Sequence, residues 1–116
     1  MANELEDRLF NFSIRVINGV RKLPNEKEYK VIAYQLIKSA TSVGANYQEA
    51  QGAVSQADFT NKIGLCLKEI RETNYWIRII IAIYHNEKTD WETLKQESNE
   101  LKNILASIYN KMKLKK

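Results

Sequence analysis

The sequence predicts an all-α protein, an antiparallel up-and-down four-helix bundle, on the strength of three observations. Four glycines and one proline in 116 residues are too few for the turns of a β-sandwich or barrel. Three breaks divide the chain into four segments of helical length. Each segment carries apolar residues at alternating steps of three and four, the repeat of helices that pack side by side. We expect one domain over residues 1–116, with helices at about 4–22, 26–51, 56–86 and 90–113.

Each break has a local cause. Pro24 lacks an amide hydrogen and ends the first segment. After the break at 52–55, Ser55 and Asp58 resemble a capping box in which Asp replaces the usual Glu. After the break at 86–90, Thr89 or Asp90 can cap the last helix. The four inward seams run, in order, through Leu5, Leu9, Phe12, Val16, Val20 and Leu23; through Tyr29, Ala33, Leu36, Ala40, Val43, Tyr47 and Ala50; through Phe59, Ile63, Cys66, Ile70, Thr73, Ile77, Ile80 and Tyr84; and through Trp91, Leu94, Ser98, Leu101, Leu105, Ile108 and Met112.

Two of the expected helices carry more apolar surface than one bundle covers. The first has a second stripe at Phe10, Ile14 and Ile17, and the third has apolar residues off its seam. Each such side chain gains about 1.5 to 3 kcal/mol from burial, so copies of the chain are expected to cover one another in an obligate, ring-like homo-oligomer. The alternative is that the chain's own short loops cover these side chains. The expected interface residues are Phe10, Ile14, Trp76, Ile79 and Ile83.

The positive charge lies at one end of the chain. The net charge is +4, but residues 1–101 hold 13 basic and 14 acidic side chains. The whole positive excess therefore comes from five lysines after residue 101: Lys102, Lys111, Lys113, Lys115 and Lys116. No apolar run approaches the roughly 20 residues of a membrane helix, and the acidic N-terminus does not resemble a secretory signal. The sequence therefore predicts a cytoplasmic protein without a membrane partner.

The residues needed for catalysis or metal binding are missing from the pattern. A di-iron bundle needs a Glu-x-x-His pair on each of two helices, and His85 is the single histidine. It lies at a helix end, where a cation has an ordinary structural role. Cys66 is a seam residue among apolar neighbours, so an inert core thiol is expected. The glycines form no phosphate-binding loop. We expect no enzyme, no metal and no cofactor.

A polar set brackets the second break. If the helices on either side are antiparallel about residue 54, Glu49 and Asn46 lie opposite Lys62. We expect an ion pair between Glu49 and Lys62 that fixes helix register, with Asn46 as a candidate third member. A ligand-binding role is the alternative. The full set consists of Ser42, Asn46, Glu49, Lys62, Glu69 and Thr73.

The stretch at 42–79 resembles the signature of the "four helix bundle protein" family, also called the 23S rRNA intervening sequence protein or S23 family. In that family a Ser-[Ile/Val]-x-Ala-Asn segment precedes a Glu, a Ser, an Asp-Phe pair and a Lys-Glu-x-x-Glu-Thr run that ends in aromatic residues. A small departure is Ala50, where members often have glycine. The matching residues are Ser42, Val43, Ala45, Asn46, Glu49, Ser55, Asp58, Phe59, Lys68, Glu69, Glu72, Thr73, Tyr75 and Trp76.

The resemblance implies a bacterial protein. The family is in turn similar to the accessory variability determinant of diversity-generating retroelements, a pentamer of four-helix protomers that binds nucleic acid and a reverse transcriptase. It thus implies a homopentameric ring, while the function of most family members is not established. We expect an oligomeric nucleic-acid-binding protein, most simply for structured RNA, or alternatively a scaffold for a protein partner such as a reverse transcriptase. The expected phosphate-binding residues are Arg8, Arg15, Lys22, Lys111, Lys113, Lys115 and Lys116.

Overall fold

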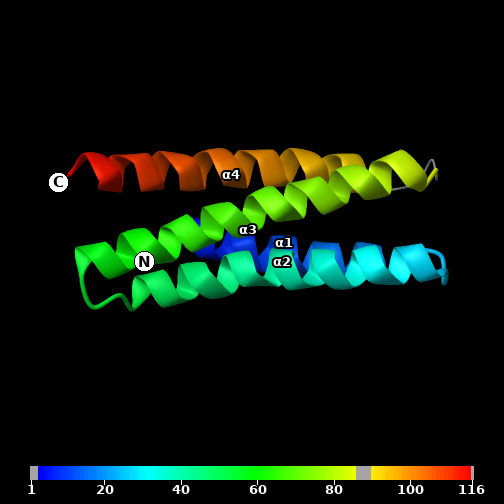
Figure 1. The fold of residues 1–116 in the computed structure, drawn as a ribbon, viewed down its shortest axis with the longest axis horizontal. Coiled ribbons are helices and arrows are strands. Elements are labelled where there is room, and N and C mark those ends of the chain that lie inside the picture. The colour runs from blue at the N-terminus through cyan, green and yellow to red at the C-terminus, as the bar shows by residue number, and fades with distance from the viewer. Residues whose placement is uncertain (1–2, 86–89, 116) are drawn as a thin grey trace.

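The computed structural model describes residues 3–85 and 90–115. Within these residues the chain is all α-helical and contains no strand (Figure 1). The helices are α1 (Glu4–Val20), α2 (Lys27–Gln51), α3 (Gln56–Ile83) and α4 (Trp91–Leu114). The expected break at 86–90 and the capping residue Thr89 fall largely outside the described residues.

Side chains and backbone groups at the helix ends explain where the helices start and stop. At α1, the Asn3 Oδ1 accepts a hydrogen bond from the Glu6 amide at 3.1 Å. At α3, Ser55 Oγ accepts from the Asp58 amide at 3.0 Å, as the predicted capping box requires. Asp58 Oδ2 accepts from the Val54 amide at 3.2 Å, one residue before the N-cap, and not from the Ser55 amide of a standard box. Asp90 occupies the N-cap position of α4 without a side-chain cap bond.

Two helices are shorter than the sequence pattern predicts. The pattern carries the first helix to residue 22, but α1 ends at Val20 because the chain tightens there into bonds between residues three apart, Lys22 to Gly19 and Leu23 to Val20. These bonds precede Pro24, which cannot continue a helix. The pattern carries the third helix to residue 86, whereas α3 ends at Ile83 and Tyr84 has extended backbone.

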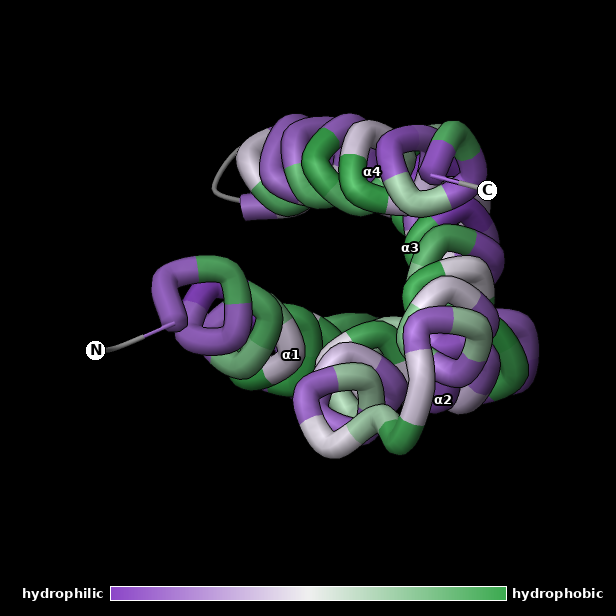
Figure 2. The backbone as a smooth tube through the Cα atoms, turned by 90° about the vertical axis from the view of Figure 1, so that its left-hand side faces the viewer, coloured by the Kyte–Doolittle hydropathy of each residue, from purple (hydrophilic) through white to green (hydrophobic). Residues whose placement is uncertain are grey.

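Each helix packs against its neighbours in sequence, and α1 also touches α4. The helices alternate in direction, so the chain termini lie at one end with the α2–α3 connection, and the α1–α2 connection lies at the opposite end (Figure 1). The molecule is elongated, 47 × 27 × 19 Å. Figure 2 shows α1 and α4 spread apart at the end of the bundle that holds the termini. The up-and-down arrangement is therefore present, with its least extensive contact between the first and last helices.

The core follows the predicted seams, although Ser39 and Leu67 are buried outside them and seam residues near the helix ends, such as Leu5 and Met112, are only half-buried. Residues from all four helices are almost fully buried, for example Phe12, Leu36, Ile70 and Leu101. Buried hydroxyls lie between neighbouring helices: Thr73 Oγ1 is 2.9 Å from Ser39 Oγ across α2 and α3, and Asn74 Nδ2 donates to Ser98 Oγ at 2.8 Å across α3 and α4. Because an unpaired buried hydroxyl or amide is costly, these bonds fix the register of α3 against both neighbours.

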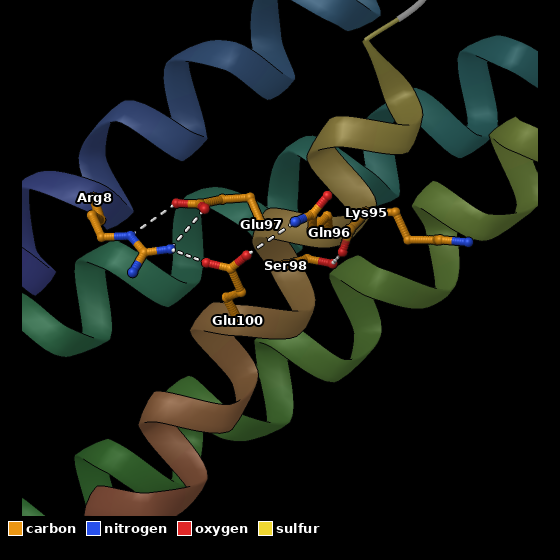
Figure 3. A network of polar contacts seen from close by, with 6 residues as sticks. All are labelled: Arg8, Lys95, Gln96, Glu97, Ser98 and Glu100. Carbon is orange, nitrogen blue, oxygen red and sulfur yellow. Dashed lines mark hydrogen bonds and ion pairs between the residues drawn. The ribbon is translucent and has the colours of Figure 1, made fainter.

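Side-chain contacts toward both ends of α1 join it to α4. The Trp91 ring lies against Gly19, where an added Cβ would stand 3.0 Å from Trp91 Cζ2 and would push the ring away by a few tenths of an ångström. Toward the other end of α1, Arg8 donates to both oxygens of Glu97, at 2.7 and 3.1 Å, and to Glu100 at 3.1 Å (Figure 3). Gln96 donates to the same Glu100 at 3.4 Å.

Among the described residues, no helix has the length and apolar composition needed to cross a membrane.

Candidate functional site

An open apolar groove runs along the outer face of α1 and α2. It encloses about 370 Å³ and is lined on α1 by Phe10, Ile14 and Ile17, the second stripe that the sequence singles out. Phe10 is 66% exposed and Ile14 43% exposed. The rest of the lining consists of Glu6, Ser13, Thr41, Gly44, Ala45 and Gln48. The single chain therefore leaves this stripe open to solvent.

The outer face of α3 carries the other residues of the expected interface. Ile83 is 40% exposed, Ile79 is half-buried, and Tyr75 beside them is 51% exposed. Trp76 differs, because it packs against the core of its own chain and its Nε1 donates to Glu72 at 3.0 Å. Trp76 is therefore partly covered by its own chain. The cover comes from the helix bundle, and not from a loop as in the alternative stated for these residues.

Of the lysines near the C-terminus, Lys111 and Lys113 lie in the last turn of α4 and Lys115 is its C-cap. Lys111, Lys113 and Lys115 are exposed, and none forms an ion pair with any described carboxylate. Lys113 Nζ lies 5.6 Å from the centre of the Tyr109 ring, close enough for a cation–π contact. Lys116 lies outside the described residues. Two of these lysines also complement the dipole of α4, whose last turn contains Lys111 and Lys113.

The three basic residues spaced seven apart from α1 into the turn after it have different surroundings. Arg8 is held by Glu97 and Glu100, and its hydrogen bond to Glu97 raises the pKa of the guanidinium above its ordinary value. Its charge is neutralised within the chain. Arg15 is half-buried and Lys22 is exposed, and neither forms an ion pair with a described residue.

The expected ion pair at the α2–α3 hairpin is present. Lys62 Nζ lies 3.2 Å from Glu49 Oε1, with the two side chains 30% and 62% exposed. Asn46 does not join it, because its Nδ2 donates to the Ser42 carbonyl on its own helix at 2.9 Å. Thr73 lies deeper, within hydrogen-bond distance of Ser39 Oγ and of the Glu69 carbonyl oxygen at 2.8 Å. The set spans α2 and α3 without converging on a single point.

The groups with reactive chemistry do not form a site among the described residues. Cys66 is fully buried, its Sγ donates to the Val43 carbonyl at 3.4 Å, and burial raises the pKa of this thiol to about 12. His85 is exposed just beyond α3. Within the described ranges, no cluster of His, Cys, Asp or Glu could hold a metal ion.

Comparison with known proteins decides the family. The family model described as "23S rRNA-intervening sequence protein" matches residues 3–107, which is nearly the whole bundle. The chain belongs to the 23S rRNA-intervening sequence protein family. The resemblance seen in residues 42–79 is thereby confirmed.

A solved member of the same group has the same fold. It is a crystal structure of a protein of unknown function from the S23 ribosomal protein family of Bacteroides thetaiotaomicron. The two chains are 36% identical, the match covers 93% of this chain and 96% of that one, and the TM-score is 0.83. Among curated proteins, none matches the present chain.

Proposed function

We propose that the protein is a non-catalytic cytoplasmic binding protein that assembles with copies of itself into a ring and binds nucleic acid through the lysines at the end of α4. The observation that supports it most is the group Lys111, Lys113 and Lys115, exposed and without a carboxylate partner among the described residues. Lys116 follows them in the sequence. Free surface cations of this kind release counterions from phosphates on binding.

Self-assembly multiplies this charge. Each copy adds its own group of lysines, and a ring of five copies, the number that the resemblance implies, presents five such groups to one polyanion. Arg15 and Lys22 add basic side chains elsewhere on the protomer, with Lys22 at the opposite end of the bundle from the α4 lysines, whereas Arg8 is left out because two carboxylates already neutralise it. The exposed apolar surfaces on α1 and α3 support the assembly step, since water contact with these side chains is unfavourable.

A protein-interaction scaffold is the second candidate. The groove between α1 and α2 favours it, because an apolar groove of about 370 Å³ can receive an apolar side of a partner protein as readily as another copy. In that case a polymerase such as a reverse transcriptase, or another protein, binds the assembly and the lysines serve solubility.

A salt titration separates the two candidates. We expect RNA binding by the whole protein to weaken steeply with salt. The triple variant Lys111→Gln, Lys113→Gln, Lys115→Gln should make the negative slope of log K against log salt shallower by about 2 to 3. Filter binding measures both. The matched control is Lys95→Gln. Because Lys95 already pairs with Glu92 at 3.5 Å, this substitution should leave the slope unchanged. RNA binding that is absent, or indifferent to salt and to the triple variant, would contradict the nucleic-acid proposal and favour the scaffold.

A further inference from the structure

Toward the α1–α2 connection, the face that carries the apolar groove continues with charged and aromatic residues. On α1, Arg21 comes one turn after Ile17, in line with the groove stripe. On α2, which runs the opposite way, Tyr34 lies seven residues before the groove residue Thr41 and so shares its side of the helix. Because the two helices are antiparallel, both continuations lead to the same end of the bundle. Beyond the groove at this end, the two helices therefore carry a cation and an aromatic ring in line with it.

The surface beyond the groove is basic. Residues 15–38 contain six basic side chains and two acidic ones. On α2, Lys27, Lys30 and Lys38 flank Tyr34 at spacings of seven, four and four, which keeps all of them on its side of the helix. We call Arg21, Lys27, Lys30, Tyr34 and Lys38 the Tyr34 face.

No described carboxylate neutralises the Tyr34 face. Its four cations are exposed, and none is ion-paired with a described residue. Glu28 points roughly 120° around α2 from Tyr34, given 3.6 residues per turn. Glu26 precedes the helix as its N-cap. The field above Tyr34 is therefore positive, which favours a polyanion.

An aromatic ring stands at the centre of this positive field. Tyr34 is 65% exposed, whereas Tyr29 and Tyr47 of the same helix are buried. Lys30 and Lys38 lie one turn to either side of it. A ring flanked by cations is the arrangement on which unpaired bases stack while their phosphates are neutralised. Bases inside a duplex are already stacked on each other and cannot use such a ring.

The other exposed tyrosine offers a weaker surface. Tyr75 on α3 is 51% exposed and also has basic neighbours. Its ring, however, packs edge-on against Trp76 with centroids 5.2 Å apart, and Glu72 bonded to Trp76 brings a carboxylate to this surface. Tyr34 has neither an aromatic neighbour nor a carboxylate among the contacts of the described residues.

We propose that the Tyr34 face is a second nucleic-acid contact surface, separate from the lysines of α4, and that it takes single-stranded nucleic acid by stacking an unpaired base on Tyr34 while Arg21, Lys27, Lys30 and Lys38 contact phosphates. The inference extends the proposed nucleic-acid binding and rests on it. It specifies the form of nucleic acid: a single strand or a loop contacts the face, and a continuous duplex does not.

Fluorescence anisotropy with the full-length protein tests the stacking step. The probes are a labelled single-stranded RNA of mixed sequence and the same strand annealed to its complement. Tyr34→Ala should weaken binding of the single strand by about 5- to 100-fold and leave duplex binding within about twofold of the unsubstituted protein. Tyr34→Phe keeps the ring and should bind both probes like the unsubstituted protein. Since Tyr34 is exposed, both variants should fold, and circular dichroism verifies this.

The phosphate contacts have a separate readout. The double variant Lys30→Gln, Lys38→Gln should make the negative slope of log K against log salt for the single strand shallower by about 1.4. Each lost phosphate contact reduces the magnitude of the slope by about 0.7. The ion-paired Lys95→Gln is again the matched control and should not change the slope.

The outcomes distinguish this inference from the proposed function. If the unsubstituted protein binds and the α4 triple variant loses binding while Tyr34→Ala does not, the Tyr34 face is not a contact surface and the proposed function stands. If Tyr34→Ala weakens binding of both probes equally, the stacking role is wrong. It is also wrong if the substitution changes the mass of the assembly but leaves the affinity unchanged when assemblies of the same mass are compared. If the unsubstituted protein binds neither probe at low salt, both proposals fail.

Discussion

At the scale of single residues, surroundings decide what each side chain can do, and the sequence shows only part of them. The burial of Cys66 could be predicted from the sequence, because Cys66 is a seam residue, and the structure buries it completely. The partners of Arg8 could not be predicted in this way. It shares a spacing of seven with Arg15 and Lys22, yet its carboxylate partner Glu97 is 89 residues away, so the pair exists only once the last helix has closed against the first.

Cys66 gives a prediction at this scale. The native thiol should not react with a disulfide reagent at neutral pH, because it is buried and its pKa is about 12. Its ordinary value is 9.0, so above that pH the unfolded chain releases the proton and the native chain retains it. The contribution of Cys66 to the free energy of unfolding should therefore fall as pH rises above 9.0.

The measurement compares the protein with Cys66→Ala by urea unfolding at several pH values. The difference in the free energy of unfolding between the two should shrink with rising pH, by up to about 1.4 kcal/mol per pH unit. Rapid labelling of the native thiol at pH 7, or a difference that stays constant above pH 9.0, would contradict the burial of this group.

At the scale of helices, the apolar repeat predicts the elements well because burial imposes it. The Glu49–Lys62 pair was also predictable, since a short connection forces α2 and α3 to run side by side from residue 54 outward. The placement of Trp76 was not. It lies on the edge of α3 between the core and solvent, and a small rotation of the helix decides which side it joins. The Tyr34 face does not follow from the inward seams, because its residues point outward, although the position of Tyr34 off the α2 seam already indicates an exposed ring.

The link between α1 and α4 gives a prediction at this scale. Arg8→Gln removes the two-pronged bond to Glu97 and the bond to Glu100, and should lower the free energy of unfolding by about 1 kcal/mol, because the pair is partly shielded from solvent. Urea unfolding at one fixed protein concentration measures it. Lys95→Gln, which removes an exposed pair within α4, should cost less than about 0.5 kcal/mol. Equal losses from the two variants would show that Arg8 does not hold the helices together.

At the scale of the whole molecule, the exposed or half-buried apolar residues of the expected interface lie on two different outer faces, one over α1 and α2 and the other over α3. In Figure 2 these helices occupy different sides of the open arrangement. A contact between unlike faces of identical chains repeats from copy to copy and closes into a ring when the rotation permits. This geometry underlies both the proposed assembly and the repetition of its basic surfaces around it.

The mass of the protein in solution tests the proposed assembly most directly. One chain has a mass of 13.5 kDa. Sedimentation equilibrium at micromolar concentration should give a single multiple of that mass, and Phe10→Ser, which removes a 66% exposed ring from the groove, should shift the protein toward smaller species. A stable species of 13.5 kDa over the whole concentration range, unchanged by Phe10→Ser, would contradict self-assembly.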